Sequence, residues 1–432
     1  MLTKKTWFVI ISLGFLGSLA WGVENQFFNT FMYNNITPDP RPISWMVAAS
    51  AIAATLSSIF MGALSDRVRW KIGRKPFLLF GYLAWGITTA IFPTAAYLKP
   101  VGIAVFVAIV FDCVMTFFGS TANDSVFHAY VADITTESNR GKVMGILEIL
   151  TWVALLIVYG GAGFLISAFG PFTFFYIIGG LVLILGTVAG ALVKEKKDAK
   201  LPQGSYWSQI VDTFRWSNLK NHKELFLLLL GISLWGIAQN IFFPYLLIYV
   251  QHFLKVPQGI DSILIFLAIL FGGIGSAYPF GLLTDHWGRK KVALLAIFGE
   301  MIGLLLWSFA RSYVGIVITG ILWLAPISAW TISTSAWSKD LFPEEKRGQF
   351  GGYVILFSVL LTMVPGPLIG SWLATAYGIP TVLDGQAGFI PTQLIFQAGG
   401  LATLLAAIPI FLIKEKKKNI APALKTTSVE NE

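Results

Sequence analysis

The chain has 432 residues, of which 56% are hydrophobic and 12% charged, and its mean hydropathy is +0.72. Soluble domains carry about 25% charged residues, so this composition excludes an ordinary soluble protein and indicates a membrane protein with several spans. The net charge of +9 could suggest a nucleic-acid partner, but the placement of the charges argues against it. The single cysteine, Cys113, excludes an intrachain disulfide.

Twelve apolar segments are each long enough to cross a membrane as a helix, which needs about 20 residues. They cover residues 7–33, 45–65, 77–98, 101–128, 143–168, 171–193, 224–252, 262–284, 291–310, 313–337, 350–376 and 392–413. The runs are continuous rather than alternating, which predicts an all-α membrane protein and not a barrel. No small-residue cleavage site follows the first run, so we expect no removable signal peptide.

Lysine and arginine residues predict the orientation of the spans. With the N-terminus in the cytoplasm, 27 of the 31 basic residues fall in cytoplasmic segments, and four fall in outside loops. Those four are Arg41, Lys99, Lys255 and Arg311. We therefore expect a multi-pass protein of the cell membrane with both termini in the cytoplasm. Its expected partner is the lipid bilayer and not nucleic acid.

Three motifs recur along the chain. GALSDRVRWKIGRK (62–75) resembles GLLTDHWGRKK (281–291), and DITTESNRG (133–141) resembles DLFPEEKRG (340–348). A Trp-Gly pair occurs at 21–22 and at 235–236. The offsets of 219, 207 and 214 are nearly equal, which predicts two six-helix halves related by a pseudo-two-fold axis. The predicted division is an N-terminal bundle (1–193), a cytoplasmic linker (194–223), a C-terminal bundle (224–413) and a cytoplasmic tail (414–432).

Two parallel halves with a site near the midplane are the architecture of alternating access. One chain already contains both halves, so a monomer suffices. The repeated cytoplasmic loops carry acids beside arginines, and ion pairs worth about 0–1 kcal/mol each would suit a reversible gate. The alternative is that these charges merely set the topology. The gate candidates are Asp66, Arg67, Arg74, Asp133, Arg140, Asp285, Arg289, Asp340 and Arg347.

Carboxylates lie within the spans, whereas no lysine or arginine lies well inside one. The five acids are Glu24, Asp112, Asp124, Glu148 and Glu300. A charged side chain at the bilayer centre costs about 2.5–3.5 kcal/mol on insertion scales. These acids must therefore be protonated, bind a cation, face water or bond the hydroxyls of a ligand. Two of them, Glu148 and Glu300, lie close enough to a cytoplasmic loop to reach it instead.

The repeat places neutral residues opposite the acids of the first half. Its offsets pair Glu24 with Ala238, Asp112 with Thr319, Asp124 with Thr331, His128 with Ser335, and Glu148 with Ile355. This asymmetry predicts one ion-coupled site, contributed mainly by the first half, to which the second half adds hydroxyls and amides.

Helix geometry refines this site. A rise of about 1.5 Å per residue puts Asp112 near mid-membrane. Thr121, Asp124 and His128 share one helical face by their spacing, and a bend is possible at Gly119 and Ser120. The substrate-binding candidates are Trp21, Glu24, Asn25, Asp124, His128, Gln239, Asn240 and Thr331. The cation-coupling candidates are Asp112, Thr121 and Glu148. For His128 and the tryptophans, a purely structural role is the alternative.

The G-x-x-x-D…G-R-K loops resemble the signature of the major facilitator superfamily over nearly the whole chain. SDRVRWKIGRKPFLLFG (65–81), TANDSVFHAYVADIT (121–135) and VPGPLIG (364–370) resemble one branch of it, the glycoside–pentoside–hexuronide:cation symporters and the related sucrose transporters. That resemblance implies that Glu24 and Asp124 bind sugar hydroxyls and that Thr121 belongs to a cation site.

The chain also departs from the melibiose-type permeases of this branch. Their two acids in span 2 correspond to Ala54 and Ser58, and their lysine in span 11 has no match. Sucrose-type transporters also lack the span 2 acids, use protons, and have an aspartate that Asp112 resembles. The resemblance therefore favours protons over sodium as the coupling ion.

These observations predict a cation-coupled symporter of a neutral sugar or glycoside. The main alternative is a proton-coupled antiporter of cationic or hydrophobic molecules, and a non-transporting sensor or a lipid flippase is a further one. We expect no enzyme, metal site or cofactor beyond H+ or Na+, because we find no metal cluster, nucleotide-binding loop or catalytic triad in the sequence.

Overall fold

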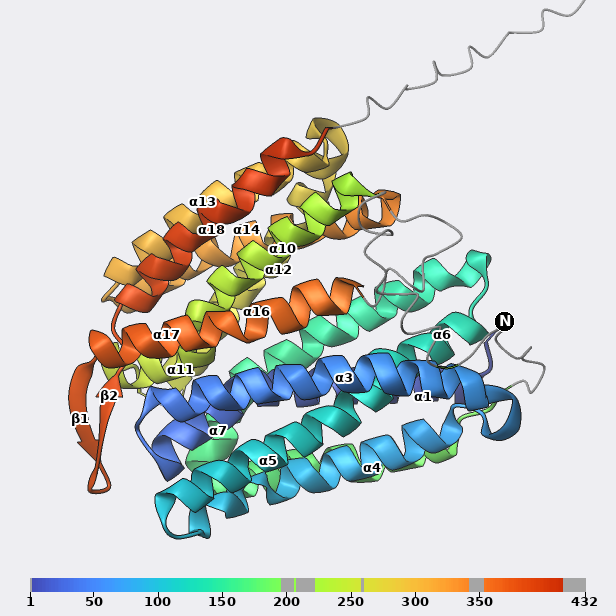
Figure 1. Cartoon of the computed structure of the whole chain (residues 1–432), viewed down its shortest axis with the longest axis horizontal. Helices are drawn as coiled ribbons and strands as arrows, with labels where there is room; N and C mark the ends of the chain where they lie inside the picture. Colours follow the sequence, from blue (N-terminus) through green and yellow to red (C-terminus); the bar gives the residue numbers. More distant parts are fainter. Residues whose placement is uncertain (1, 196–205, 207–221, 258–259, 342–352, 415–432) are drawn as a thin grey trace, which may run out of the picture.

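The computed structural model describes residues 2–195, 206, 222–257, 260–341 and 353–414. In this part of the chain, long helices run along one axis of the molecule (Figure 1). Eleven of the described helices are long and apolar enough to cross a membrane. One of them, α7 (Glu137–Ala191), contains the non-helical residue Gly170, with φ 82° and ψ 161°. Because α7 therefore comprises two spans, the structure agrees with the twelve predicted, and the all-α fold class is confirmed.

The first half of the structure (2–195) contains six spans. Its elements are α1 (Lys4–Val23), η1 (Glu24–Phe28), α2 (Asn29–Phe31), η2 (Met32–Ile36), α3 (Pro40–Ile72), α4 (Lys75–Ile91), η3 (Phe92–Tyr97), α5 (Val101–Gly119), η4 (Ser120–Phe127), α6 (His128–Ile134) and α7. Short elements continue the helix before them, so that α1 to η2, for example, form one span of 33 residues.

The second half (222–414) contains the remaining spans. Its elements are α10 (Lys223–Phe242), η5 (Phe243–Tyr245), α11 (Leu246–Ile248), η6 (Tyr249–Phe253), α12 (Ile260–Trp287), α13 (Arg289–Phe309), α14 (Tyr313–Leu341), η8 (Leu356–Leu360), α16 (Leu361–Met363), α17 (Pro365–Ala376), β1 (Ile379–Leu383), β2 (Gln386–Ile390) and α18 (Leu394–Leu412). The elements η1, η2, η4, η6 and η8 are π-helical, and η3 and η5 are 3₁₀-helical.

Glycines bring α4 and the second part of α7 into backbone contact. A Cβ added at Gly86 would lie 2.4 Å from the Leu183 nitrogen, and one at Gly179 would lie 2.5 Å from the Ala90 nitrogen. At Gly190 the added Cβ would lie 2.9 Å from a backbone atom of α4. No side chain fits between the two helices at these points. We call Gly86, Gly179 and Gly190 the glycine contact.

An antiparallel hairpin of β1 and β2, which the sequence analysis did not predict, joins α17 to α18. Its two-residue turn is Asp384-Gly385, with φ values of 50° and 78°. Two left-handed residues are what a type I′ turn requires, and Asp-Gly suits it. We call this end of the bundle, at the left of Figure 1, the hairpin end.

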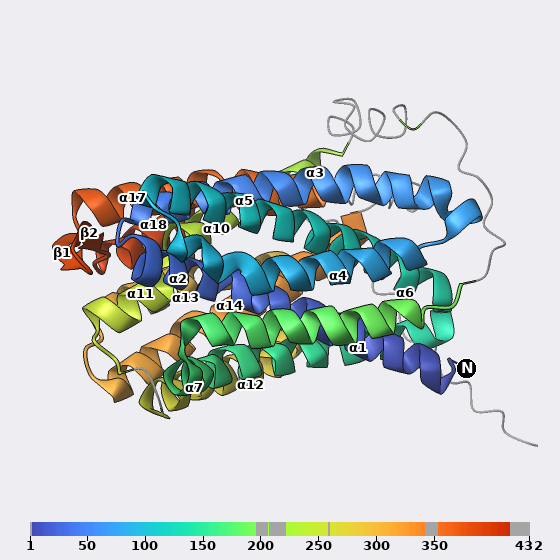
Figure 2. The same ribbon diagram turned by 90° about the horizontal axis from the view of Figure 1, so that it is seen from below.

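The opposite end, where the chain begins, is the charged end (Figure 1). It carries Asp66, Arg74, Asp133, Arg289 and Asp340. Figure 2 shows α7 of the first half and α12 of the second along one edge of the bundle, where they pack together.

Hydrogen bonds join the two halves between the middle of the bundle and the hairpin end. Gln26 Nε2 donates to the Phe243 carbonyl (3.0 Å), and Asn34 Nδ2 donates to Gln251 Oε1 (3.1 Å). The hairpin itself contacts the first half, because the Phe389 nitrogen donates to the Pro38 carbonyl at 3.0 Å. The Tyr33 hydroxyl donates to the Phe389 carbonyl at 2.9 Å.

Candidate functional site

The acids of the first half fall into two groups. Glu24 and Asp112 are 8% and 2% exposed and line the same small cavity. Asp124 and Glu148 are exposed. The cavity has a volume of about 10 Å³, close to the smallest space that holds one water molecule. Its lining residues include Asn25, Ser50, Phe28, Phe243 and Asn240 from both halves.

Hydrogen bonding within this cavity is incomplete. Thr116 Oγ1 donates to Glu24 Oε1 at 3.3 Å. Asp112 Oδ1 is buried, and no described residue bonds it. An unpartnered buried carboxylate oxygen is costly, so this one calls for a proton, a water molecule or a small cation. The described residues contain no group of three or more His, Cys, Asp or Glu side chains suited to a metal ion.

Two of these four acids lie in π-helical segments. Glu24 begins η1, and Asp124 lies within η4. Inserted π-turns are rare in helices, and those that occur often lie at functional sites. The sequence predicted a bend at Gly119 and Ser120, and the change from α- to π-helix occurs there. At Gly17 an added Cβ would lie 2.2 Å from Asn123 Oδ1, so this glycine allows η4 to approach α1 closely.

Asp124 is held by a tryptophan rather than by a basic residue. Trp21 Nε1 donates to Asp124 Oδ1 at 3.1 Å, and Asn123 Nδ2 donates to the same atom at 3.3 Å. His128 is exposed, and its Nδ1 lies 2.9 Å from the Asn123 carbonyl. Thr121 is buried and donates to the Phe117 carbonyl at 2.7 Å. Thr121 is therefore set apart from the exposed Asp124 and His128, with which the sequence placed it on one face, because the wider π-turn changes the angular spacing.

The second-half candidates lie in three different settings. Asn240 lines the cavity, and its Nδ2 donates to the Gly236 carbonyl at 2.8 Å. Gln239 Nε2 donates to Glu300 Oε1, and Thr331 is exposed on α14. Glu300 is fully buried. The expectation that it could reach a loop is wrong, because α10 covers it and supplies its hydrogen-bond donors.

Each half contains a pair of packed tryptophans. The rings of Trp21 and Trp85 lie 4.9 Å apart, and those of Trp235 and Trp330 are stacked at 5.4 Å with an interplanar angle of 20°. Trp21 and Trp235 are the tryptophans of the repeated Trp-Gly pair, and both are partly exposed. Asn25, one turn after Trp21, donates its Nδ2 to the Trp21 carbonyl at 2.8 Å.

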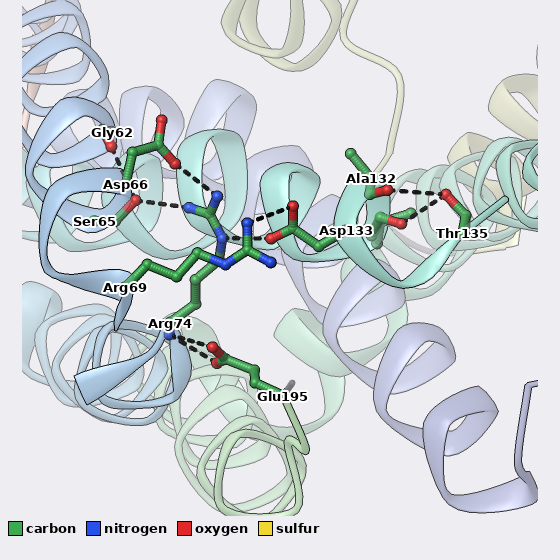
Figure 3. Close-up of polar contacts among 10 residues, drawn as sticks. Gly62, Ser65, Asp66, Arg69, Arg74, Ala132, Asp133, Thr135 and Glu195 are labelled. Carbon is green, nitrogen blue, oxygen red and sulfur yellow. Dashed lines mark hydrogen bonds and ion pairs between the residues drawn. The ribbon is translucent and has the colours of Figure 1, made fainter. Parts of the chain in front are cut away.

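At the charged end, Arg74 is the centre of a polar network (Figure 3). Its side chain is 4% exposed and bonds Asp66 Oδ1 at 2.6 Å and Asp133 Oδ2 at 2.9 Å. Arg69 bonds the other oxygen of Asp133 at 2.9 Å. Burial lowers the pKa of Arg74, but Asp66 and Asp133 more than offset this and raise it above its ordinary value. Glu195 accepts two bonds from the Arg74 backbone nitrogen, at 2.7 and 2.8 Å.

The second half has a related ion pair between Arg289 and Asp340. Arg289 also donates to the Ala336 carbonyl at 3.1 Å. Among the described residues, no ion pair of Asp285 is found, and Arg347 lies outside them.

In the first half, Arg67 follows Asp66 near the end of α3. Arg140 donates to Thr135 Oγ1 at 3.4 Å, whereas Asp133 bonds Arg69 and Arg74. Each ion pair described at the charged end joins two elements of the same half.

The family follows from a match over most of the chain. The model of the Major Facilitator Superfamily matches residues 10–281 and 262–429. The chain belongs to the Major Facilitator Superfamily. It is therefore a multi-pass membrane transporter for small molecules and not an enzyme.

The solved structures of two transporters have the same fold. The nucleoside transporter NupG superposes with a TM-score of 0.72 at 15% identity, covering 96% of this chain and 100% of that one. The xylose transporter XylE from E. coli, in an inward open conformation, gives 0.67 at 14% identity, covering 96% and 97%. Identities this low establish the fold alone.

Two characterised relatives share part of the sequence. Multidrug resistance protein 2 of Bacillus subtilis is 29% identical over 197 residues, 44% of this chain and 45% of that protein. Multidrug transporter QDR2 of Candida glabrata is 31% identical over 144 residues, 33% of this chain and 24% of that protein. The chain thus matches less than half the length of either relative.

Two residues of the polar interior were not predicted from the sequence. Ser50 lines the cavity, and Thr116 bonds Glu24. Glu300 was predicted as an intramembrane acid, but its bond with Gln239 was not. Thr116 follows Asp112 by four residues, so helical spacing already placed the two on one face. Pairing Glu300 with α10 depended on helix packing, which spacing along the chain does not show.

Proposed function

We propose that this protein is a proton-coupled symporter of a neutral, hydroxyl-rich molecule such as a sugar or glycoside, working by alternating access between its two halves. The observation that carries the proposal is the cavity shared by Glu24 and Asp112, whose Oδ1 has no partner among the described residues. Glu24 and Asp112 lie together although they belong to two different spans, and no lysine or arginine lies well inside any span. Such a pair of carboxyl groups favours the uptake and release of a proton.

Protons are preferred to sodium for two reasons. The span 2 positions that supply acids to the sodium site of the melibiose-type permeases hold Ala54 and Ser58. The cavity offers two carboxylates and a volume of about 10 Å³, which suits a proton and one water molecule better than a fully coordinated metal ion. We assign Asp112 as the proton-coupling residue and Glu24 as its partner.

The exposed Asp124 suits the substrate. An ionised carboxylate accepts hydrogen bonds from hydroxyls about twice as strongly as a neutral acceptor does. Trp21 holds this carboxylate and presents a partly exposed ring on which an apolar sugar face could stack. The structural neighbours named as nucleoside and xylose transporters carry substrates with hydroxyl-bearing rings, which supports this choice of chemical class.

The orientation follows from the basic residues. If the charged end faces the cytoplasm, the hydrogen bonds between Gln26 and Phe243 and at the hairpin hold the outer side together in this state. The Arg74 and Arg289 networks would then serve as the cytoplasmic gate, exchanging partners within one half for partners in the other. A monomer suffices for this cycle, and the branch assignment to the glycoside and sucrose transporters is part of the proposal.

A second candidate is a proton-coupled antiporter of cationic or hydrophobic molecules. The observation in its favour is the partial similarity to two multidrug transporters. Exposed and buried carboxylates beside tryptophans also suit an organic cation, because ring faces attract cations.

Transport by purified protein in vesicles separates the two candidates. We expect an imposed inward proton gradient to drive accumulation of a methyl glycoside, and an inward sodium gradient to have no such effect. Asp112→Asn should abolish accumulation but retain exchange of labelled for unlabelled glycoside, since exchange needs no net proton transfer. Cys113→Ser, at the neighbouring position, is the matched control. Proton-driven loss of an organic cation from the vesicles, with no glycoside uptake, would refute symport and support the antiporter.

A further inference from the structure

Glu300 is a buried acid that the proposed mechanism leaves unused. It lies on α13 and is 0% exposed, so no ligand can touch it in this structure. Both of its oxygens accept hydrogen bonds from α10. Trp235 Nε1 donates to Oε2 at 2.5 Å, and Gln239 Nε2 donates to Oε1. Trp235 and Gln239 are four residues apart and therefore lie on one face of α10.

The first half contains a similar arrangement of one acid and two tryptophans, but the acid and the second tryptophan lie on different helices from those in the second half. There the repeated tryptophan, Trp21, donates to Asp124 beyond α5 and packs on Trp85 of α4. In the second half, Trp235 donates to Glu300 of α13 and stacks on Trp330 of α14. By the repeat, α13 corresponds to α4 and α14 to α5. The acid and the second tryptophan have therefore changed helices between the halves.

The two acids also differ in exposure. Asp124 is exposed and can meet a ligand directly, whereas Glu300 can act only through the side chains that it bonds. Trp235 donates to one oxygen of Glu300, and Gln239 donates to the other through its amide nitrogen, so the NH₂ group of Gln239 is turned toward Glu300. No described residue donates a hydrogen bond to the amide oxygen of Gln239.

We propose that Glu300 is a positioning residue of the substrate site. It fixes Gln239 with its amide nitrogen on the carboxylate and leaves the amide oxygen as the group that accepts from the substrate. It also fixes the Trp235 ring against Trp330. The site consequently selects substrates that present a hydrogen-bond donor, a hydroxyl or an N–H, to Gln239. This inference rests on the proposed function, and it takes Gln239, which is 8% exposed and a substrate-binding candidate from the sequence, as part of the substrate site.

Glu300→Gln tests the inference by changing what Gln239 presents. Glutamine offers one acceptor oxygen, which Trp235 occupies, and an NH₂ group, which then faces Gln239. The Gln239 amide must turn to offer that NH₂ group its oxygen. Its own nitrogen is then left to the substrate, so the side chain presents a donor where the native protein presents an acceptor.

The measurement is competition against methyl glycoside uptake by a set of analogues in which each hydroxyl in turn is replaced by fluorine. Fluorine accepts a hydrogen bond weakly and cannot donate one. For the native protein, we expect one replacement near Gln239 to lower affinity about tenfold or more. In Glu300→Gln, the same replacement should lower affinity by less than about threefold or should raise it. The losses of affinity from replacing the other hydroxyls should stay as they are in the native protein.

Two variants make the test specific. In a Gln239→Ala background, Glu300→Gln should no longer alter discrimination among the analogues, as a double-mutant cycle requires if Glu300 acts through Gln239. Ile302→Ala, at a position of the same helix that is 51% exposed, should leave the pattern as it is in the native protein. An equal loss for all analogues in Glu300→Gln, or an unchanged pattern, would overturn the inference.

Failure of the proposed function gives a different result. If the native protein binds no glycoside, the symporter proposal falls, and the same variants are compared with a tertiary ammonium ion and its quaternary methyl analogue. The tertiary ion has an N–H donor and the quaternary ion has none. A native preference for the tertiary ion that disappears in Glu300→Gln would support the positioning role, and a preference equal in both proteins would overturn it.

Discussion

Gly388 in the hairpin lies where the two halves meet. A Cβ added there would lie 2.0 Å from the Pro38 carbonyl oxygen and 2.8 Å from the Pro38 Cβ. The first of these is a backbone atom, which cannot turn aside as the end of a long side chain can. Gly388→Ala should therefore push the hairpin away from residue 38 while leaving the extended conformation of β2 itself acceptable.

The magnitude follows from the contacts that would be lost. The hairpin donates from the Phe389 nitrogen to the Pro38 carbonyl at 3.0 Å and accepts from the Tyr33 hydroxyl at 2.9 Å. At about 0.5–1.5 kcal/mol net for each bond, the substitution should disfavour this state by about 1–3 kcal/mol. That corresponds to a shift of about 5- to 150-fold toward states in which the two halves part at the hairpin end.

A reporter cysteine would measure this shift. In a Cys113→Ser background, Val47→Cys places a thiol on α3 at a cavity-lining position that is 7% exposed. Its rate of labelling by a membrane-impermeant maleimide, added from the hairpin side, should rise by the same factor in Gly388→Ala. Ala387→Ser, at the exposed neighbouring position, is the control. An unchanged rate in Gly388→Ala, or an equal rise in the control, would refute the reasoning.

Three further predictions concern other contacts. Tyr33→Phe removes one of the two hairpin bonds and should raise the same labelling rate about 2- to 13-fold; no rise would mean that this bond does not hold the halves. Arg74→Ala should lower the free energy of unfolding in detergent by about 1–3 kcal/mol, whereas Arg140→Ala should lower it by less than about 0.5 kcal/mol. Thermal unfolding of the two variants measures this difference, and equal losses would contradict the role given to the Arg74 network. Gly170→Ala, at φ 82° and ψ 161°, should destabilise by about 1–3 kcal/mol, whereas Gly161→Ala, with open space around its Cβ, should stabilise by up to about 1 kcal/mol.

The arrangement of spans could be predicted from the sequence because hydropathy acts over about 20 residues at a time. Gly170 and Pro171 separate two runs that the structure joins in α7, and the sequence still indicated two spans there. The hairpin was missed although Asp384-Gly385 is a recognised turn signal. Its strands are short and lie in a segment between two spans, where the hydropathy pattern says nothing about pairing.

The polar interior could be predicted only as a set of residues. The sequence located Glu24, Asp112 and Asp124, but their grouping depended on the turns of η1 and η4, which are π-helical. A single inserted π-turn changes the angular spacing between the side chains before it and those after it, such as Thr121 and Asp124. The bond from Gln239 to Glu300 depends on which helices are neighbours in space.

The glycine contact has a mechanical consequence. Gly86 and Gly179 bring the backbones of α4 and the second part of α7 into contact. The two helices cannot slide past each other without a steric clash, so they form one rigid unit. A rocking motion of this half would then carry both helices as one body. Bending would be left to segments such as η1 and η4, which carry Glu24 and Asp124. Flexibility would then be concentrated in the short stretches that hold two of the acids used in the proposed cycle.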